Sequence, residues 1–431
     1  MLDIQFIRDN RDLVQTSAKN KNIDVDIAQL LELDNERRTR LTQIEELRAR
    51  RNAQAGDTQN QRPTDEQIAA GRQLKEEITA RETDLQTIDA QYTELLKQVP
   101  NIALEDVPVG TSEDDNVVSK TVGEVPQFDF EPKSHADIAE AKGWLDKERA
   151  AKVAGSRFAY IKGDLVKLQF AIIQFVMDKL TDPDFLDAVI AKNNLSVSNK
   201  PFVPVLPPLM LRTELYDAMD RLEPRDDRYK IEDEDLWLQG SAEHVLGSMH
   251  ADEILNAEEL PIRYLGYATS FRREAGTYGK DMEGMFRMHQ FDKLEMESLT
   301  AADDGTQEHL FLIAIQEELM QLLGLPYEVM TKCTADIGKP NARGVDINGW
   351  MPGQGKYRET HTADYMTDYQ ARRLQTRVRT ANGTELVHTN DATALPLSRG
   401  PIAIIENYQT ADGDVIVPEV LRPYMGGKAQ I

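Results

Sequence analysis

The chain has 431 residues, a formal net charge of −24 at pH 7 and a single cysteine, Cys333. One cysteine excludes a disulfide framework and a thiolate-rich metal site, so we expect no zinc site built by the protein. No run is long and apolar enough to span a membrane, and the first residues lack a basic segment followed by an apolar one, which predicts a cytoplasmic protein with no membrane partner.

The first predicted elements are two long helices joined by a polar turn. Residues 71 to 95 carry apolar side chains at intervals of three and four, typical of a coiled coil, and residues 27 to 55 have a compatible, interrupted pattern. The turn-forming sequence GDTQNQRPTD lies between them, with Thr64 or Asp65 as N-cap of the second helix. We predict an antiparallel two-helix arm over about 27 to 98, within an N-terminal helical domain of residues 1 to 104. An oligomerisation helix pair is the alternative.

Arginines are concentrated in the first of these helices. Residues 36 to 51 contain six arginines against three glutamates. The acidic total argues against indiscriminate nucleic-acid binding, because phosphate contacts need concentrated Lys and Arg. A local basic cluster can still bind a polyanion, and the alternative is a solvated helix face.

A change of composition follows Pro100. Residues 105 to 135 are rich in Pro, Gly and acidic residues and are predicted to be an irregular linker, with a second domain over 136 to 431. Helices are predicted at 136 to 150, 163 to 181 and 306 to 323. Strands are predicted near 202 to 206, 262 to 267, 286 to 296, 327 to 331, 345 to 350, 357 to 362 and 385 to 389. This irregular spacing favours an α+β fold with an antiparallel sheet flanked by helices.

The stretch FRREAGTYGKDMEGMFRMHQFDKLE, residues 271 to 295, predicts a hairpin with unusually many charges. Alternate residues of a strand share a face, which would place Arg272 beside Glu274. The same alternation would align Arg287, His289, Phe291, Lys293 and Glu295. An exposed hairpin with a solvated charged face is the alternative.

Common nucleotide and hydrolase motifs are missing from the sequence. There is no GxxxxGK[ST], GxGxxG, GxSxG or HExxH. Besides the hairpin, arginines and glutamates occur in QGSAEH, in YRET and at Arg399, where Pro401 opens a predicted helix. Several arginines facing one cleft suit a triphosphate, and glutamates suit an ammonium group, an adenine amino group or Mg²⁺. The pattern predicts nucleotide activation without a P-loop.

Several longer phrases carry a resemblance to a known family. The phrases VPNIALEDVPVG, KVAGSRFAYIKG, GSAEH, the FRREAG to FDKLE hairpin and NYQTADGDVIVPEVLRPYMGG closely resemble the seryl-tRNA synthetases, a family of class II aminoacyl-tRNA synthetases, over essentially the whole chain. The resemblance implies an ATP-dependent ligase that converts L-serine to seryl-adenylate and pyrophosphate and transfers serine to the 3′ end of tRNA(Ser). It implies Mg²⁺ bound with ATP, tRNA(Sec) as a second candidate acceptor, and a homodimer, because Pro207 or Pro208 resembles the first class II motif.

The resemblance also implies residue roles. Arg272 would bind the α-phosphate and Arg399 the γ-phosphate side, both as catalytic residues, while Glu359 would hold Mg²⁺. The implied ATP-binding residues are Arg272, Arg273, Glu274, Arg287, Met288, Phe291, Glu359, Thr360, His361, Thr362 and Arg399. The implied serine-binding residues are Ser241, Ala242, Glu243, Arg272, Glu295, Asp391 and Thr393. The implied tRNA-binding residues are Arg37, Arg38, Arg40, Arg48, Arg50 and Arg51.

The sequence departs from the family around its third motif. Asp391 stands where asparagine is usual, Ala392 and Ala394 replace glycines, and Asn348 lies in an altered segment, VDINGW. These changes leave two alternatives open. One is a related ligase that loads a different amino acid or a carrier acceptor, and the other is a non-catalytic coiled-coil paralogue.

Overall fold

The structure is a computed structural model that describes residues 1–57, 64–275 and 284–431. It divides into two compact units, Met1–Ile102 and Ala103–Ile431. Most of the predicted polar turn between the long helices, and the centre of the predicted hairpin loop with Gly276 and Gly279, lie outside the described residues.

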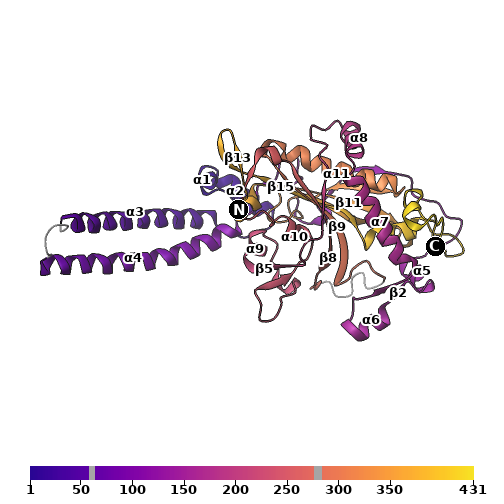
Figure 1. Cartoon of the computed structure of the whole chain (residues 1–431), viewed down its shortest axis with the longest axis horizontal. Coiled ribbons are helices and arrows are strands. Elements are labelled where there is room, and N and C mark those ends of the chain that lie inside the picture. Colours follow the sequence, from indigo (N-terminus) through magenta and orange to yellow (C-terminus); the bar gives the residue numbers. More distant parts are fainter. Residues whose placement is uncertain (58–63, 276–283) are drawn as a thin grey trace. The chain divides into compact units, whose positions relative to one another are not determined.

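The first unit is helical. The long helices α3 and α4 run antiparallel and pack side by side (Figure 1). Buried Ile44 and Leu47 from one helix and Ile78 and Ile88 from the other form their apolar seam. Thr64 caps α4, since its Oγ1 accepts from the Gln67 N–H at 3.3 Å while the Gln67 side chain accepts from the Thr64 N–H at 2.9 Å. The predicted two-helix coiled coil and its Thr64 cap are confirmed. The helices are α1 (Ile4–Asp9), α2 (Arg11–Asn20), α3 (Ile27–Asp57) and α4 (Asp65–Gln98).

The second unit is built on an eight-stranded sheet with the order β1-β10-β11-β12-β15-β9-β8-β4. Neighbouring strands are antiparallel except β4 and β8, which are parallel. The predicted α+β class with an antiparallel sheet is confirmed. In sheet order the strands are β1 (Val117–Val122), β10 (Tyr327–Thr331), β11 (Arg343–Met351), β12 (Lys356–Thr367), β15 (His388–Pro396), β9 (Gln290–Thr300), β8 (Ile262–Phe271) and β4 (Val203–Val205). Shorter strands are β2 (Leu145–Asp146), β3 (Tyr160–Ile161), β5 (Met210–Arg212), β6 (Leu236–Leu238), β7 (Ile254–Asn256), β13 (Arg377–Thr380) and β14 (Gly383–Leu386).

Helices cover this sheet (Figure 1). Helix α11 packs on β12 and β15, and α7 contacts β8 and β15. Their buried apolar side chains form the main core with those of the sheet and α13. No helix within the described ranges is both long and apolar enough to cross a bilayer. The helices are α5 (His135–Ala141), α6 (Lys147–Ala154), α7 (Asp164–Leu180), α8 (Pro183–Asn193), α9 (Thr213–Ala218), α10 (Glu243–Leu246), α11 (Gly305–Leu322), α12 (Tyr369–Leu374) and α13 (Arg399–Asn407).

Three predicted segments differ from the structure. The segment 105 to 135, expected to be irregular, contains β1, whose β-branched sequence VVSKTV pairs with β10. The helix predicted over 136 to 150 is two helices, because Gly143 adopts a left-handed φ of 64° and the chain turns into β2. The strand predicted at 385 to 389 is split between β14 and β15.

The charged hairpin is formed by β8 and β9, which pair from Ile262 with Leu299 to Phe271 with Gln290. The strand alternation predicted for Arg272 and Glu274 is wrong. Both residues follow the end of β8, and Glu274 has a left-handed φ of 53°. Arg287 and His289 likewise precede β9, whereas Phe291, Lys293 and Glu295 lie on it at alternate positions. The outer charges therefore belong to the ends of the loop, just past the paired strands, where one backbone bond, from the Arg272 N–H to the His289 carbonyl at 3.0 Å, still joins the two segments.

Candidate active site

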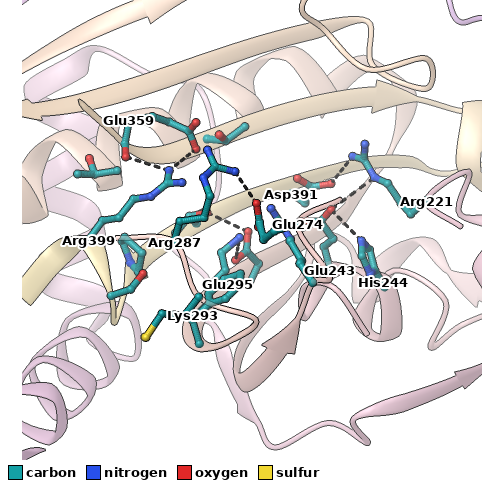
Figure 2. A pocket seen from close by; sticks show the side chains of 18 of the residues that line it. Arg221, Glu243, His244, Glu274, Arg287, Lys293, Glu295, Glu359, Asp391 and Arg399 are labelled. Carbon is teal, nitrogen blue, oxygen red and sulfur yellow. Dashed lines mark hydrogen bonds and ion pairs between the residues drawn. The ribbon is translucent and has the colours of Figure 1, made fainter. Parts of the chain in front are cut away.

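A cleft of about 320 Å³ lies over the sheet beside the charged hairpin. Figure 2 labels ten of its lining side chains: Arg287 and Arg399 lie toward one end, and Glu243 and Asp391 lie with Arg221 toward the other. The predicted residues that line it are Glu243, Arg272, Glu274, Arg287, Met288, Phe291, Glu295, Glu359, Thr360, Thr362, Asp391, Thr393 and Arg399. Segments more than a hundred residues apart in sequence therefore contribute to one cavity.

Two ion pairs join arginines and glutamates at the first end. Arg287 donates from Nη1 to Glu274 Oε2 at 2.5 Å. Arg399 donates from Nη1 to Glu359 Oε1 at 2.8 Å and to the Glu359 carbonyl at 3.0 Å. Both arginines and both acidic partners line the cleft, so an incoming anion can share or replace the partner of each arginine.

Arg272 is fixed from two sides. Its Nε donates to the Gly240 carbonyl at 3.0 Å, and its guanidinium lies 5.5 Å from the centre of the Phe291 ring. Its own carbonyl bonds His289 Nδ1 at 2.9 Å, which makes His289 a brace of the hairpin outside the cleft lining. The side chain of Arg272 is therefore aimed before any ligand binds.

Phe286 is held between two further guanidinium groups. Its ring centre lies 3.9 Å from Arg358 and 4.7 Å from Arg399. Cation–π attraction of this kind stabilises both arginines while leaving their N–H groups available as donors. Phe286 thus orients Arg399 toward the cleft, a role that strand patterns alone do not reveal.

The end of the hairpin loop is anchored to α13 through His135. The Met285 N–H donates to His135 Nε2 at 3.3 Å, and His135 Nδ1 lies 2.9 Å from Glu406 Oε1. A Cβ at Gly284 would come within 2.0 Å of His135 Nε2, so only glycine allows this approach. These contacts fix the backbone at Met285, two residues before Arg287.

Glu359 is a half-exposed carboxylate at the arginine end, with 50% of its side chain accessible. Partial desolvation in the cleft opposes its charge, but the positive charges of Arg399, Lys332 and Arg272 outweigh that effect and lower its pKa to about 2. An ionised, accessible carboxylate is the oxygen ligand that Mg²⁺ prefers. The residue therefore fits a metal ion that arrives with a nucleotide.

The acidic end is organised around Glu295 on β9. Thr393 of β15 donates from Oγ1 to Glu295 Oε1 at 3.1 Å, and Lys293 Nζ lies 2.7 Å from Oε2. Burial is the largest influence and raises the pKa of Glu295, although Lys293 partly offsets it. Gln316 fixes Thr393 by donating to its carbonyl at 2.8 Å.

Glu243, at the start of α10, is held by a buried cation and a histidine. Arg221 Nε lies 3.4 Å and His244 Nε2 3.4 Å from its Oε1. Burial favours the neutral acid, but His244 and Arg221 hold the pKa of Glu243 well below its usual range. Ser241 Oγ donates to the other carboxylate oxygen at 3.1 Å. Glu243 is thus a fixed negative charge in the cleft wall.

Asp391 is the altered residue noted in the sequence, and it too contacts Arg221. The two side chains lie 3.3 Å apart, and Asp364 approaches the same guanidinium at 3.6 Å. Burial and the charge of Glu243 raise the pKa of Asp391 well above its usual value, and the same causes, with Asp391 itself, raise that of neighbouring Glu297. The acidic end therefore carries less negative charge than its number of carboxyl groups indicates.

Four predicted residues do not line the cleft. Ser241 and Ala242 are fully buried behind it, although Ser241 bonds Glu243. Arg273 donates its backbone N–H to the Asp227 carbonyl at 3.1 Å. His361 is buried with Nδ1 2.8 Å from Thr360 Oγ1, and burial lowers its pKa to about 3. These residues shape the wall that the others present.

The predicted arm arginines fall into two groups. Arg37, Arg40 and Arg48 form ion pairs across the hairpin with Asp89 at 2.5 Å, Asp84 at 3.2 Å and Glu82 at 2.6 Å. The other three are exposed, and no ion pair within the described part of the chain engages them. This second group is Arg38, Arg50 and Arg51. Part of the basic cluster therefore stabilises the pairing of α3 with α4, and part faces solvent.

Sequence reasoning missed several lining residues: Arg221, Arg228, His244, Phe286 and Asp364. Arg221 follows α9 in a segment without a recognisable motif, so its convergence with Asp364 and Asp391 depends on the tertiary fold. Strand alternation predicts that Lys293 shares a face with Glu295 but gives no role for it. His244 is the residue after the predicted Glu243, and this adjacency was its available signal.

The chain is similar in sequence and structure to known proteins. The family model of the tRNA synthetase class II core domain (G, H, P, S and T) matches residues 228–408, and that of the seryl-tRNA synthetase N-terminal domain matches residues 1–103. The serine-tRNA ligase of Exiguobacterium sibiricum is 40% identical, with 99% of each chain covered. That of Nitrosopumilus maritimus is 36% identical, with 100% of each covered. The crystal structure of seryl-tRNA synthetase from Pyrococcus horikoshii complexed with ATP matches with a TM-score of 0.89 at 38% identity, covering 100% of this chain and 99% of that one.

The antiparallel sheet, the arginine-lined cleft and the core model define a class II tRNA synthetase. Within this class, the chain is 40% identical to a serine-tRNA ligase over almost its full length, and its N-terminal domain matches that of the seryl-tRNA synthetases. The chain belongs to the seryl-tRNA synthetase family, as its sequence motifs predicted.

Proposed function

We propose that the protein is a serine-tRNA ligase, which forms seryl-adenylate and pyrophosphate from L-serine and ATP and then transfers serine to the 3′ end of tRNA(Ser). One observation carries the proposal. A single cleft is lined by Arg272, Arg287 and Arg399 and also by Glu243 and Glu295, and Figure 2 shows Arg287 and Arg399 toward one end and Glu243 toward the other. The first group suits a triphosphate and the second an amino acid's ammonium group, which are the two charges that this reaction must bring together.

In the activation step the serine carboxylate attacks the α-phosphorus of ATP. The bond from the α-phosphorus to the bridging oxygen breaks, and pyrophosphate leaves with its electron pair. No side-chain nucleophile is needed, so the protein contributes positioning and electrostatic stabilisation. Arg272 is braced by Gly240 and Phe291 and faces the reacting phosphate, while Arg287 and Arg399 hold the phosphates that depart.

The adenosine end is assigned to the hairpin. Phe291 offers a ring for stacking on adenine, Glu274 accepts from the adenine amino group, and Met288 contributes backbone contacts. Glu359, aided by Thr360 and Thr362, would hold Mg²⁺. When bound with ATP, the ion would neutralise phosphate charge. Arg399 is then shared between Glu359 and the γ-phosphate.

The amino-acid end is assigned to the acidic residues. Glu243 is ionised and suits the ammonium group of serine. Glu295 and Thr393 form a hydrogen-bonded pair of the kind that can accept from and donate to a hydroxyl group. A site built to bond a hydroxyl rejects analogues that lack it, because its own buried polar groups would lose their partners. This supports serine over alanine.

The exposed arginines of α3 are proposed to contact tRNA. Arg38, Arg50 and Arg51 present donors to solvent along one helix, and such donors suit phosphate contacts. tRNA(Sec) is a second acceptor to be tested, and the proposed compartment is the cytoplasm.

We further propose that the protein acts as a homodimer. Strand β4 is an edge of the sheet, and Val203 and Leu206 there are 54% and 77% exposed. Apolar side chains on an open edge suit coverage by a second copy. Sedimentation equilibrium at micromolar concentration should give twice the chain mass, and a monomer would contradict this assignment.

The transfer reaction is tested by aminoacylation of purified tRNA(Ser) and tRNA(Sec) transcripts with labelled serine and ATP. We expect ATP-dependent, acid-precipitable charging of tRNA(Ser), with an Arg272→Ala variant as the inactive control. Charging with another amino acid, loading of a carrier in place of tRNA, or no ATP-dependent product would each overturn the proposal. The last outcome would favour the non-catalytic alternative.

A further inference from the structure

Lys293 occupies the acidic end of the cleft, and no role in the reaction has been assigned to it so far. Its Nζ lies 2.7 Å from Glu295 Oε2 and 3.3 Å from Ser241 Oγ. Only 12% of its side chain is exposed, against 2% for Glu295. Figure 2 shows the lysine directed from β9 into the cleft, beside Glu295.

The lysine ammonium stands among the groups proposed to bind serine. Its Nζ contacts Glu295, which is proposed to bond the serine hydroxyl, and Ser241 in the wall behind the cleft. Its charge also acts on Glu243, which is proposed to bind the serine ammonium. Two ammonium groups in one small acidic pocket repel each other, so both cannot keep these contacts. Binding of the amino acid therefore requires Lys293 to give up its contact with Glu295.

An amino acid brings one positive and one negative charge. Its ammonium can replace that of Lys293 at the acidic groups without changing their charge balance. The displaced lysine then remains in a largely enclosed cleft and needs an anion, because an unpaired buried charge is costly. The substrate carboxylate is attached one carbon from the new ammonium, and the flexible four-carbon stem of lysine can follow it.

We propose that Lys293 exchanges partners on substrate binding: it holds Glu295 in the empty cleft and moves to the α-carboxylate of the bound amino acid. The inference rests on the proposed function. Lys293 is thereby a further substrate-binding residue, and it neutralises the attacking carboxylate while directing it toward the side of Arg272 and the phosphates. No covalent step is added.

The test compares two ligands that differ only in this carboxylate, L-serine and L-serinamide. Titration calorimetry measures both dissociation constants for the full chain and for Lys293→Met, with a non-hydrolysable ATP analogue present and at a pH where both amino groups are protonated. We expect serine to bind the unsubstituted protein more tightly than serinamide. In Lys293→Met this preference should fall about tenfold or more, the effect of losing one charge-assisted contact.

Thermal unfolding tests the other half of the exchange. Without Lys293 the acidic groups lack their cation, so serinamide should raise the melting temperature of Lys293→Met by more than it raises that of the unsubstituted protein. Lys293→Arg should retain part of the serine preference. Lys428→Met, which removes an exposed lysine paired with Asp164 outside the cleft, is the matched control and should behave like the unsubstituted protein.

The outcomes separate this inference from the proposed function. If Lys293→Met weakens serine and serinamide equally, Lys293 only balances Glu295 and the exchange is wrong. The same conclusion follows if neither ligand is affected. Should the unsubstituted protein fail to bind serine while still binding the ATP analogue, the proposed function itself fails. If Lys293→Met no longer unfolds cooperatively, Lys293→Arg takes its place. For Lys293→Arg, a serine preference and a serinamide stabilisation that both equal those of the unsubstituted protein count against the exchange.

Discussion

His244 shows how a single buried residue sets the charge of the site. The Gly240 N–H donates to its Nδ1 at 3.1 Å, which assigns the ring proton to Nε2, the atom that faces Glu243. Burial is the main cause that lowers the pKa of His244 to about 4. The ring therefore remains neutral at pH 7 and holds Glu243 as a hydrogen-bond donor without adding a positive charge.

This pKa predicts how stability depends on pH. An unfolded histidine has a pKa near 6.5. Below that pH the imidazole is protonated in the unfolded chain but stays neutral in the folded protein. The stability contributed above pH 6.5 is lost as pH falls toward 4. Between pH 7 and pH 5 the protein should lose about 2 kcal/mol relative to His244→Gln, which keeps an acceptor and a donor.

Urea unfolding followed by tryptophan fluorescence provides the measurement, because Trp144, Trp237 and Trp350 all lie in the second unit. The two proteins should show parallel curves between pH 7 and pH 8. Equal losses of stability on acidification to pH 5 would mean that His244 is charged in the folded protein, contrary to this account.

At the scale of elements, the hairpin that carries the site is attached to helix α11 by a buried ion pair. Arg263 of β8 donates to both oxygens of Glu308 at 2.6 and 2.7 Å, and Ser298 of β9 donates to the same carboxylate at 2.8 Å. Arg263 also donates to two loop carbonyls. The pair therefore fixes both strands of the hairpin against one helix.

Breaking this pair should be costly. Glu308→Gln leaves a fully buried arginine without its counter-charge, so we expect a loss of about 3–5 kcal/mol in the free energy of unfolding. Glu318→Gln on the same helix removes an exposed pair with Lys192 and should cost no more than about 1 kcal/mol. Tryptophan-detected urea unfolding distinguishes them, and similar losses for the two variants would contradict the assigned role.

On the scale of the whole molecule, an acidic chain must bind a polyanion through a small part of its surface. The net charge is −24, yet Arg38, Arg50 and Arg51 are exposed on α3. Three exposed cations lie on one helix, while their neighbours Arg37, Arg40 and Arg48 are paired to α4, so the proposed tRNA contact is separate from the folding of the helical hairpin.

A triple substitution of these three exposed arginines by alanine tests that separation. Each phosphate contact contributes about −0.7 to −0.9 to the slope of log affinity against log salt, so the slope for charging should become shallower by about 2 to 3. The kcat/KM for tRNA should fall about tenfold or more, while serine-dependent pyrophosphate exchange stays within about twofold.

Arg72→Ala on α4, an exposed arginine paired with Glu76, is the matched control and should leave both reactions unchanged. If charging by the triple variant keeps its full salt dependence, the tRNA contact lies elsewhere.

Much of this organisation could be predicted from the sequence where the signal is local. The period of α4, the Thr64 cap and the alternation of Phe291, Lys293 and Glu295 on β9 follow from neighbouring residues. The left-handed conformation of Glu274 could not be predicted because the alternating strand pattern of the sequence continues past Phe271, where β8 ends. The meeting of Arg221 with Asp364 and Asp391 escaped it because three distant segments converge there without a shared motif.

We propose that this cleft activates serine with ATP. Amino-acid-dependent exchange of labelled pyrophosphate into ATP, measured with each of the twenty amino acids, tests it most directly, with Arg272→Ala as control. We expect exchange with serine alone, and its loss in the Arg272→Ala variant. Exchange with another amino acid would show that Asp391 and the neighbouring alanines have changed the pocket, and no exchange with any amino acid would contradict the claim.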